Sequence, residues 1–420
     1  MPNLQNDGNN IDQHGRSVTP PQGAVLDAVD DAEMIALCSR LVQARSENPP
    51  GNEVAPAKIV AEWCRELGGE ATLTEPMPGR PNVVARFPGT GSASSLAFSA
   101  HMDLVPVKPA EYERWDQDPY GGEVIQGELW GRGSVDMKGG LAAAMAAMKA
   151  LLDSEIDLPG DLWLLASMDE ELEMTGTKAM INSGIIDSVG AAVVCEPTNL
   201  QLDCASKGRT WATIGVLGEA AHARFKDGGV NAITNALRLA ASLDETTPEH
   251  RAHHSAGDSW WTITEIEGGL GPAIIPDRCD LTLDVRLVPG QRCDAVWDEM
   301  REVIDRLTSE LPDFRCEVEV VERREPWEIE HQSHIATAMA TGLKNTMGTE
   351  PGFDAFPGTA DASFLAPAGI PCVICGPGDL ARAHRENERI PLTELSVAAR
   401  SYALAAIEFF KITMLSDLES

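Results

Sequence analysis

Two shortages in this 420-residue sequence exclude several classes of protein before any motif is considered. Long apolar runs are missing: none approaches ~20 residues, so we expect no membrane span. Basic side chains are few, 33 against 65 acidic ones, and the formal net charge is −32. This acidic excess argues against nucleic acid and anionic membrane surfaces as partners. Hydrophobic residues still make up 43% of the chain, which is enough for real cores and excludes wholesale disorder.

A secretory signal and a disulfide framework are also missing. Residues 1–22 are polar, contain Pro and Gly and have no apolar segment, so we expect a disordered tail rather than a signal peptide. Nine cysteines, an odd number, are scattered along the chain. Cys372 and Cys375 form a C-x-x-C, but no second pair or redox context accompanies them, which favours buried thiols. These features predict a cytoplasmic protein.

The order of the predicted elements indicates two domains. Continuous apolar strands alternate with helices up to about residue 206, which is typical of a parallel or mixed sheet covered on both faces. Residues 207–321 instead read as two helices and four strands of alternating polarity, and the first pattern then resumes. The sequence therefore predicts a larger α/β domain, residues 23–206 and 322–420, with a small α+β domain of residues 207–321 inserted into it.

Five stretches bring His, Asp and Glu side chains to predicted strand ends and turns. They are SAHMDLVP with His101 and Asp103, GRGSVDMKGG with Asp136, SMDEELE with Glu170 and Glu171, VVCEPT with Glu196, and GPGDLARAHRENE with His384. Alone, each stretch could be structural, for example a His–Asp pair or a helix N-cap. In open α/β sheets, however, functional sites lie at the carboxyl ends of strands. Two imidazoles and several carboxylates there suit two adjacent zinc-like ions bridged by a carboxylate.

These motifs resemble those of the dinuclear zinc amidohydrolases and exopeptidases, a family that includes acetylornithine deacetylase, succinyl-diaminopimelate desuccinylase, aminoacylase and glutamate carboxypeptidase. AHMDLVP, GRGSVDMKGG, SMDEE, CEPT and AHRENE occur in family order, and GEAAHARFKDGGVNAI and IIPDRCDLTLDVRLVPG match the family's inserted domain. The resemblance runs from about Ala32 to the C-terminus. It implies an α/β, mixed-sheet, zinc-exopeptidase-like catalytic domain whose inserted α+β domain serves dimerisation or acts as a lid.

The resemblance implies a ligand set for two divalent ions per subunit. His101, Asp136 and Glu196 would hold one ion, and Asp136, Glu171 and His384 the other, so that Asp136 bridges them. Zinc is the expected metal, and cobalt and manganese also suit these ligands.

Further roles follow from the same resemblance. Asp103 would orient His101, and Glu170 would be the general base that takes a proton from a water shared by the two ions. His222 matches a family position that reaches substrate, in dimeric relatives from the partner subunit. The sequence departs from the family pattern at Ala273, where an Asn that helps to hold the substrate or the transition-state oxygen is common.

Four more residues match positions that contact substrate in the family. They are Arg286, Asp361, Gly376 and Gly378. The guanidinium of Arg286 suits a substrate carboxylate because its fork matches that group bidentately. A surface arginine on a strand is the alternative interpretation of Arg286.

The resemblance implies a metal-dependent hydrolase that cleaves the amide bond of N-acyl or N-carbamoyl amino acids or similar small acids. Glu196, where peptidases of the family tend to carry Asp, favours a deacylase, and a di- or carboxypeptidase remains the alternative. A metal-free binding or scaffold protein would require the loss of a ligand or of the base, and none is lost. The expected partners are a small substrate with a free carboxylate and a second copy of the chain.

Other polar and aromatic features receive simpler interpretations. We expect His250, His253 and His254 to lie in a surface loop, because their surroundings offer no ligand spacing. Trp260 and Trp261 are expected to pack against the sheet of the inserted domain. The strand predicted at 211–217 and its neighbours are expected to offer an edge for pairing between subunits.

Overall fold

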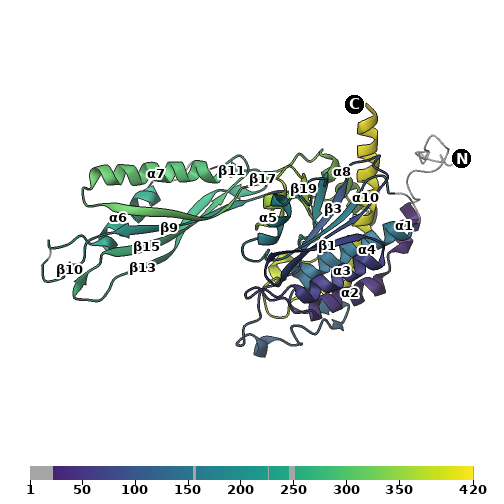
Figure 1. The fold of residues 1–420 in the computed structure, drawn as a ribbon, viewed down its shortest axis with the longest axis horizontal. Helices are drawn as coiled ribbons and strands as arrows, with labels where there is room; N and C mark the ends of the chain where they lie inside the picture. The colour runs from purple at the N-terminus through teal and green to yellow at the C-terminus, as the bar shows by residue number, and fades with distance from the viewer. Residues whose placement is uncertain (1–21, 155–157, 226, 246–250, 420) are drawn as a thin grey trace. The chain divides into compact units, whose positions relative to one another are not determined.

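The computed structural model describes residues 22–154, 158–225, 227–245 and 251–419. The chain folds into two compact units, shown as ribbons in Figure 1. The larger unit contains the chain up to Cys204, Ile329–Asp354 and the residues from Ala360 onward. The smaller unit contains Ala205–Glu328 and Ala355–Thr359. The tail expected at residues 1–22 lies outside the described residues except for Gln22, where the first helix begins.

A mixed sheet forms the centre of the larger unit. Its strand order is β1 (Glu70–Met77), β2 (Arg80–Phe87), β6 (Leu162–Ser167), β3 (Leu96–His101), β7 (Ala191–Val194), β19 (Cys372–Ile374) and β8 (Leu202–Ser206). The neighbours β6, β3, β7 and β19 run parallel, whereas β1, β2 and β8 pair antiparallel with their neighbours. Every residue of the four parallel strands is buried, as the continuous apolar runs predict.

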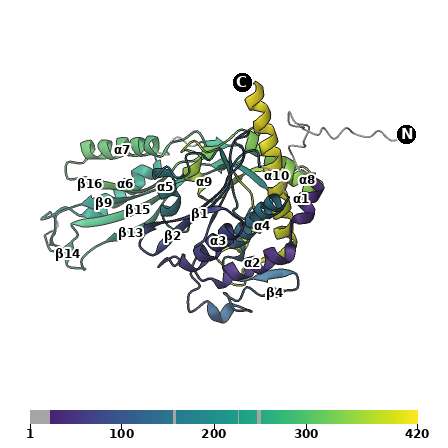
Figure 2. The same cartoon turned by 45° about the vertical axis from the view of Figure 1, so that its right-hand side comes forward.

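Helices surround this sheet. They are α1 (Gln22–Ala28), α2 (Asp31–Gln43), α3 (Val54–Glu66), α4 (Gly139–Asp153), α5 (Thr175–Asn182), α8 (His334–Met347), α9 (Ala362–Leu365) and α10 (Leu392–Glu419). Asp30 caps the start of α2: its Oδ1 accepts the backbone N–H groups of Ala32 and Glu33, both at 2.9 Å. The small-residue helix α4 lies beside α2 in both views (Figures 1 and 2). Gly140 lets α4 begin close to the sheet, because a Cβ there would lie 2.1 Å from the Cys195 carbonyl oxygen.

Short elements complete the larger unit. They are η1 (Tyr112–Arg114), β4 (Val124–Ile125), β5 (Glu128–Trp130), η2 (Ser134–Lys138), η3 (Leu380–Arg382) and β20 (Arg389–Pro391). The segment η2 leads directly into α4, so the polar residues of the Gly-rich motif stand at the start of a buried helix. The strand β18 (Phe353–Phe356) spans one boundary between the two units.

The smaller unit is a four-stranded antiparallel sheet with two helices. The strand order is β13 (Trp260–Gly268), β15 (Arg278–Leu287), β9 (Gly208–Leu217) and β16 (Arg315–Arg324), and the helices are α6 (Ala232–Glu245) and α7 (Cys293–Glu310). Alternate apolar residues of β9, such as Ala212 and Ile214, join the helices in one core. The strand β9, which contains residues 211–217, lies between β15 and β16 and is not itself an edge. Its neighbour β16 is an edge, as the expectation for this strand and its neighbours allowed, and β13 is the other edge.

Three pairs of short strands complete the smaller unit. These are β10 (Ala221–His222) with β14 (Ile274–Ile275), β11 (Ala252–His253) with β12 (Gly257–Asp258), and β17 (Trp327–Glu328) with the last two residues of β8. Trp261 packs against the core, as predicted, but Trp260 is 47% exposed because its side chain projects from the other face of β13. None of the nine cysteines forms a disulfide, and eight of them are buried. Among the helices in the described ranges, none has the length and apolar character needed to cross a membrane.

Candidate active site

The five predicted metal ligands lie together in the larger unit. His101 is the last residue of β3, and Glu171 and Glu196 follow the neighbouring strands β6 and β7. Asp136 belongs to η2, and His384 comes two residues after η3. Because β3, β6 and β7 run parallel, their carboxyl ends meet at one edge of the sheet. The topology therefore gathers residues that are widely separated in the sequence.

Asp136 stands between the two imidazoles. Its Oδ1 is 3.1 Å from His101 Nε2, and its Oδ2 is 3.1 Å from His384 Nε2. Glu196 Oε1 lies 3.7 Å from His101 Nε2, and Glu171 Oε1 lies 3.2 Å from His384 Nε2. Each half of the site thus has one imidazole, one glutamate and one oxygen of Asp136, which is the arrangement of a bridged pair of metal sites.

The hydrogen bonds of His101 fit a proton or a metal ion between its Nε2 and Asp136. Its Nδ1–H donates to the backbone oxygen of Asp103 at 3.0 Å, because a carbonyl can only accept. In the neutral ring, the Nε2 lone pair then faces the Asp136 carboxylate at 3.1 Å. Two electron-rich atoms approach so closely only when a proton or a metal ion lies between them. This second-sphere bond from Nδ1 is the usual support of a metal-binding histidine.

The charge balance also fits bound cations. Four carboxylates converge on two imidazoles: Asp136, Glu170, Glu171 and Glu196. Among the described residues, no Lys or Arg forms an ion pair with them. Burial raises the pKa of Glu196 well above its usual range, and the charge of Asp136 adds to this. Although burial opposes its charged form, Asp136 and Glu171 raise the pKa of His384 to about 10. Nitrogen and carboxylate donors in this number suit divalent metals such as zinc, cobalt or manganese.

Glu170 differs from its neighbour Glu171 in its contacts. It is buried, its Oε1 has no hydrogen-bond partner, and its Oε2 lies 4.0 Å from His101 Nε2. Burial raises the pKa of Glu170 well above its usual range, and the charges of Asp361 and Glu171 contribute. An unpartnered buried carboxylate with a raised pKa is suited to proton transfer.

Asp103 positions both His101 and the turn that carries Glu170 and Glu171. Its carboxylate accepts the backbone N–H groups of Glu170 and Glu171, each at 3.1 Å. The distance from its Oδ1 to His101 Nδ1 is 3.6 Å, longer than the 3.0 Å from its backbone oxygen. Asp103 therefore orients the imidazole chiefly through its main chain, while its side chain holds the turn that carries both glutamates.

Asp361, Gly376 and Gly378 also lie in the larger unit. Asp361 is buried and accepts from Ser167 Oγ at 2.6 Å, at the end of β6. A Cβ at Gly376 would lie 2.4 Å from the carbonyl oxygen of Glu196, so this glycine packs against the backbone of a predicted ligand. The N–H of Gly378 donates to Glu394 Oε2 at 2.7 Å. Substrate contact by these three residues remains a prediction.

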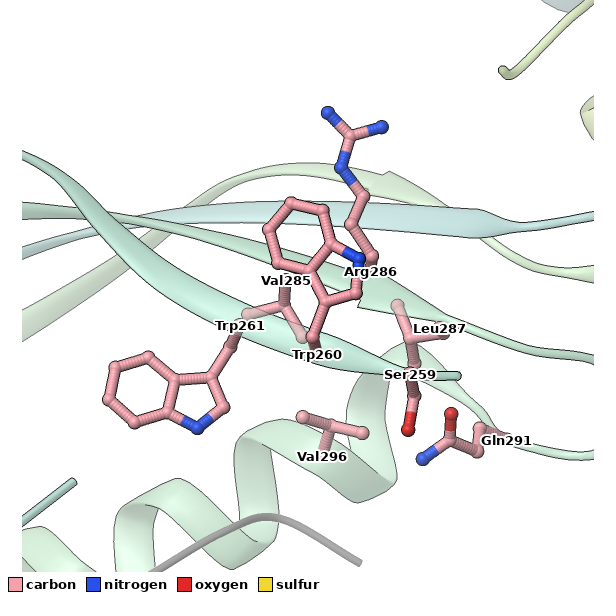
Figure 3. Close-up of a pocket in the computed structure, with 8 residues that line it drawn as sticks. All are labelled: Ser259, Trp260, Trp261, Val285, Arg286, Leu287, Gln291 and Val296. Atoms are coloured by element: carbon pink, nitrogen blue, oxygen red, sulfur yellow. The ribbon is translucent and has the colours of Figure 1, made fainter. Parts of the chain in front are cut away.

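The other two predicted substrate residues belong to the smaller unit. His222 is exposed, and its Nδ1 accepts the N–H of Arg224 at 3.1 Å. Arg286 donates from Nε and Nη2 to Asp284 Oδ2 at 3.1 and 2.9 Å. Its guanidinium lies 5.8 Å from the ring of Trp260, and Figure 3 shows both side chains at the rim of a small pocket. Arg286 is therefore held in place on a strand surface, and its role toward substrate also stays a prediction.

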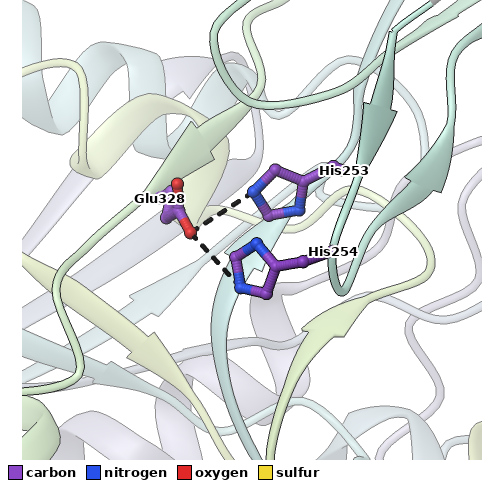
Figure 4. Close-up of side chains that lie close together, drawn as sticks. All are labelled: His253, His254 and Glu328. Atoms are coloured by element: carbon purple, nitrogen blue, oxygen red, sulfur yellow. Dashed lines mark ion pairs between the residues drawn. The ribbon is translucent and has the colours of Figure 1, made fainter.

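A second histidine cluster lies in the smaller unit. His253 is not in a surface loop as expected: it belongs to β11, its side chain is only 11% exposed, and its Nε2 lies 3.3 Å from Glu328 Oε1 (Figure 4). His254 is 3.9 Å from the same oxygen and is exposed. His250 lies outside the described residues. The Nδ1 of His253 accepts the N–H of Ala256 at 3.1 Å, so in the neutral ring Nε2 carries the proton and faces Glu328 Oε1. This tautomer, the reverse of that of His101, leaves no lone pair for a metal.

Sequence reasoning missed the buried ion pair that holds Asp136. Glu388 Oε1 accepts the N–H groups of Val135 and Asp136 at 3.0 and 3.3 Å, and its Oε2 accepts from Arg132 at 2.7 Å. Arg132 and Glu388 are both almost completely buried. The only sequence feature that could have indicated this pair is its location. Arg132 lies in the same motif as Asp136, and Glu388 lies in the same motif as His384.

Comparisons with known proteins agree with this geometry. The family described as Peptidase family M20/M25/M40 matches residues 97–408. An N-formyl-4-amino-5-aminomethyl-2-methylpyrimidine deformylase of Bacillus subtilis is 30% identical, over 86% of this chain and 91% of the relative. An acetylornithine deacetylase of Aliivibrio salmonicida is 28% identical, over 79% of this chain and 86% of the relative.

A solved structure shares the fold. It is a Bacillus subtilis protein described as a dinuclear metal binding peptidase from the M20 family, with a TM-score of 0.70 and 16% identity. The match covers 91% of this chain and 98% of that one. The family match spans most of the sequence and includes every predicted metal ligand. The chain therefore belongs to peptidase family M20/M25/M40 and is a metal-dependent amidohydrolase.

Proposed function

We propose that this enzyme removes an acyl group from the nitrogen of an amino acid or a similarly small acid. The observation that carries the proposal is the Asp136 carboxylate between His101 Nε2 and His384 Nε2, at 3.1 Å from each. In this proposal His101, Asp136 and Glu196 hold one divalent ion, and Asp136, Glu171 and His384 hold a second. Zinc is the favoured metal because its usual protein ligands are imidazole and carboxylate.

When bound, two such ions lower the pKa of a shared water and polarise the carbonyl of the scissile amide. The chain supplies the proton transfers. Glu170 takes a proton from the attacking water and passes it to the leaving nitrogen, because its Oε1 is free of other partners. Asp103 keeps the backbone of Glu170 in place during both transfers.

The relatives favour a deacylase over a peptidase. Two of them carry names that describe removal of a formyl or an acetyl group from nitrogen. Arg286, held by Asp284 beside Trp260, is proposed to bind a carboxylate of the substrate. Nine cysteines without a disulfide support a reducing, cytoplasmic setting.

We further propose that the enzyme works as a homodimer and that His222 acts in the partner's active site. Its Nδ1 accepts a backbone N–H, so the neutral ring carries its proton on Nε2, and this exposed donor can stabilise an oxyanion. Ala273 has no polar side chain for that task.

The test is a substrate screen of purified protein supplied with zinc, cobalt or manganese. The panel contains N-formyl, N-acetyl, N-succinyl and N-carbamoyl amino acids, dipeptides and N-formyl-aminomethylpyrimidine. We expect turnover of N-acyl amino acids, loss of activity on chelation and recovery at two ions per chain. Matched amides without the free carboxylate should be poor substrates. Preferred turnover of dipeptides would establish the peptidase alternative, and full activity in metal-free protein would refute the metal mechanism.

A further inference from the structure

Asn48 connects two carboxylates that frame the glutamates of the site. Its Nδ2 donates to Asp103 Oδ2 at 2.8 Å and to Asp169 Oδ1 at 2.9 Å. Asn48 is only 2% exposed, and its own Oδ1 has no hydrogen-bond partner. The opposite orientation of the amide would point an oxygen at two carboxylates, so the network fixes which way Asn48 faces.

The two carboxylates that accept from Asn48, those of Asp103 and Asp169, both stabilise the turn formed by Asp169, Glu170 and Glu171. Asp169 begins the turn with a φ of +65°, a left-handed conformation that is unfavourable for a residue with a side chain. Its carboxylate is fixed by Asn48 and by Thr175, whose Oγ1 donates to Oδ2 at 2.5 Å. Asp103 accepts the next two N–H groups of the same turn. Such a turn keeps its shape only while its surroundings hold it.

A buried arginine forms the outer end of this network. Arg80 donates from Nη1 to Asp169 Oδ1 at 3.1 Å and from Nε to Glu53 Oε2 at 3.0 Å. Its side chain is 9% exposed and that of Glu53 is fully buried. Arg80 therefore neutralises Asp169 but does not reach Asp103 through any contact of the described residues. Asn48 is the link from this ion pair to the carboxylate behind the active site.

We propose that Asn48 is a positioning residue for Glu170 and Glu171. Its two N–H donors hold Asp103 and Asp169 at fixed separation, and these two carboxylates set the backbone from which both glutamates project. The inference deepens the proposed function, because it rests on Glu170 as the base and Glu171 as a ligand. An amide is suited to this place because it offers two donors without a charge.

The test compares Asn48→Ala, Asn48→Ser and Asn48→Asp with the wild-type enzyme. Ala and Asp remove both donors, whereas Ser keeps one hydroxyl donor. Zinc affinity is measured by competition with a chromophoric chelator, and kcat and KM are measured on the best substrate of the screen. We expect zinc affinity and kcat to fall by roughly 10–100-fold in the Ala and Asp variants, with a smaller loss for Ser, while KM changes by less than about threefold.

Two further variants keep the outcomes distinct. Asn235→Ala removes another buried asparagine, on α6 of the smaller unit, whose Nδ2 donates to Asp313 O at 3.2 Å; it should leave zinc affinity and kcat unchanged. Glu170→Gln tests the proposed function itself. If Glu170→Gln is inactive while a folded Asn48→Ala or Asn48→Ser variant matches the wild type in both measurements, the role of Asn48 is refuted. If Glu170→Gln is fully active, the proposed base is wrong. In that case, weaker zinc binding by Asn48→Ala would still support the conclusion that Asn48 positions Glu171.

Discussion

The carboxylate of Glu388 holds the main chain of Asp136, accepting its N–H at 3.3 Å while Arg132 donates to the other oxygen at 2.7 Å. Asp136 is the residue that faces both imidazoles, so its position sets the geometry of the whole site. The ion pair between Arg132 and Glu388 therefore positions Asp136 through its main chain.

We predict that Glu388→Gln weakens metal binding by roughly 10–100-fold, the usual cost of losing a second-sphere partner. If the amide oxygen takes the place of Oε1, both backbone bonds remain but the NH₂ group faces the Arg132 guanidinium; in the opposite orientation, both backbone bonds are lost. The measurement is zinc competition with a chelator. Glu322→Gln, which changes a buried glutamate of the smaller unit paired with Arg209 and Arg324, is the control and should retain wild-type affinity. Equal affinities for both variants would contradict the role of Glu388.

The adjacent glutamates should give opposite phenotypes. Glu170→Gln keeps the size of the side chain but removes the proton acceptor, so we expect two bound ions and a rate reduced by roughly 10²–10⁴-fold. Glu171→Gln removes the charge that faces His384 at 3.2 Å and should lower metal occupancy. Metal content by elemental analysis and the rate at saturating metal separate the two. Reversed phenotypes would shift the assignment of base and ligand by one residue.

The gathering of the five predicted ligands could be foreseen from the sequence, because each of them lies at the end of an apolar strand or in a recognisable turn. Asn48 could not, because its partners Asp103 and Asp169 are 55 and 121 residues away and only the fold brings them together. The position of β9 between two other strands could not be predicted either. Alternating polarity indicates that one face of a strand is buried, but it does not indicate which strands flank it.

The partial burial of His253 was not predicted from the sequence for a related reason. Its partner Glu328 belongs to β17, a two-residue strand with no pattern of its own. The exposure of Trp260 depends on which face of β13 turns toward the helices, and the neighbouring Trp261 occupies that face. The assembled sheet determines which strands pair and which face of a strand turns toward the helices. The local sequence pattern does not determine either.

Asp203 should make stability depend on pH. Burial raises the pKa of its carboxyl from 3.8 to about 7, and the charge of Asp354 adds to the effect. Between these values the unfolded chain ionises at this position while the folded chain keeps its proton, so folding loses stability as pH rises from about 4 to 7. Above pH 7 the penalty remains constant.

We therefore predict that Asp203→Asn raises the melting temperature at pH 8, by an amount corresponding to about 1–3 kcal/mol, and changes it little at pH 4. Thermal unfolding of metal-free protein at both pH values is the measurement. Asp27→Asn removes an exposed carboxylate and should shift neither value appreciably. A stabilisation by Asp203→Asn that is equal at both pH values would show that ionisation is not its cause.

The trans role of His222 can be tested by subunit exchange. His222→Ala should lower the rate of a dimer because the exposed Nε2 donor is lost from both active sites. Glu170→Gln should inactivate each site through the loss of its base. If His222 acts in the partner's site, a mixed dimer of the two variants contains one site with both residues intact and one site with neither.

Mixing the two variants under conditions that allow exchange should therefore raise the activity to about half that of the native dimer per mixed dimer, because one of its two sites is complete. Mass spectrometry of differently tagged chains measures how many mixed dimers form. A mixture of Glu170→Gln with the double variant Glu170→Gln, His222→Ala is the control and should stay inactive, since no site in it has a base. If His222 acts within its own chain, every site of the mixed dimer lacks one residue, and exchange would restore nothing. A fully active monomer would also exclude the trans arrangement.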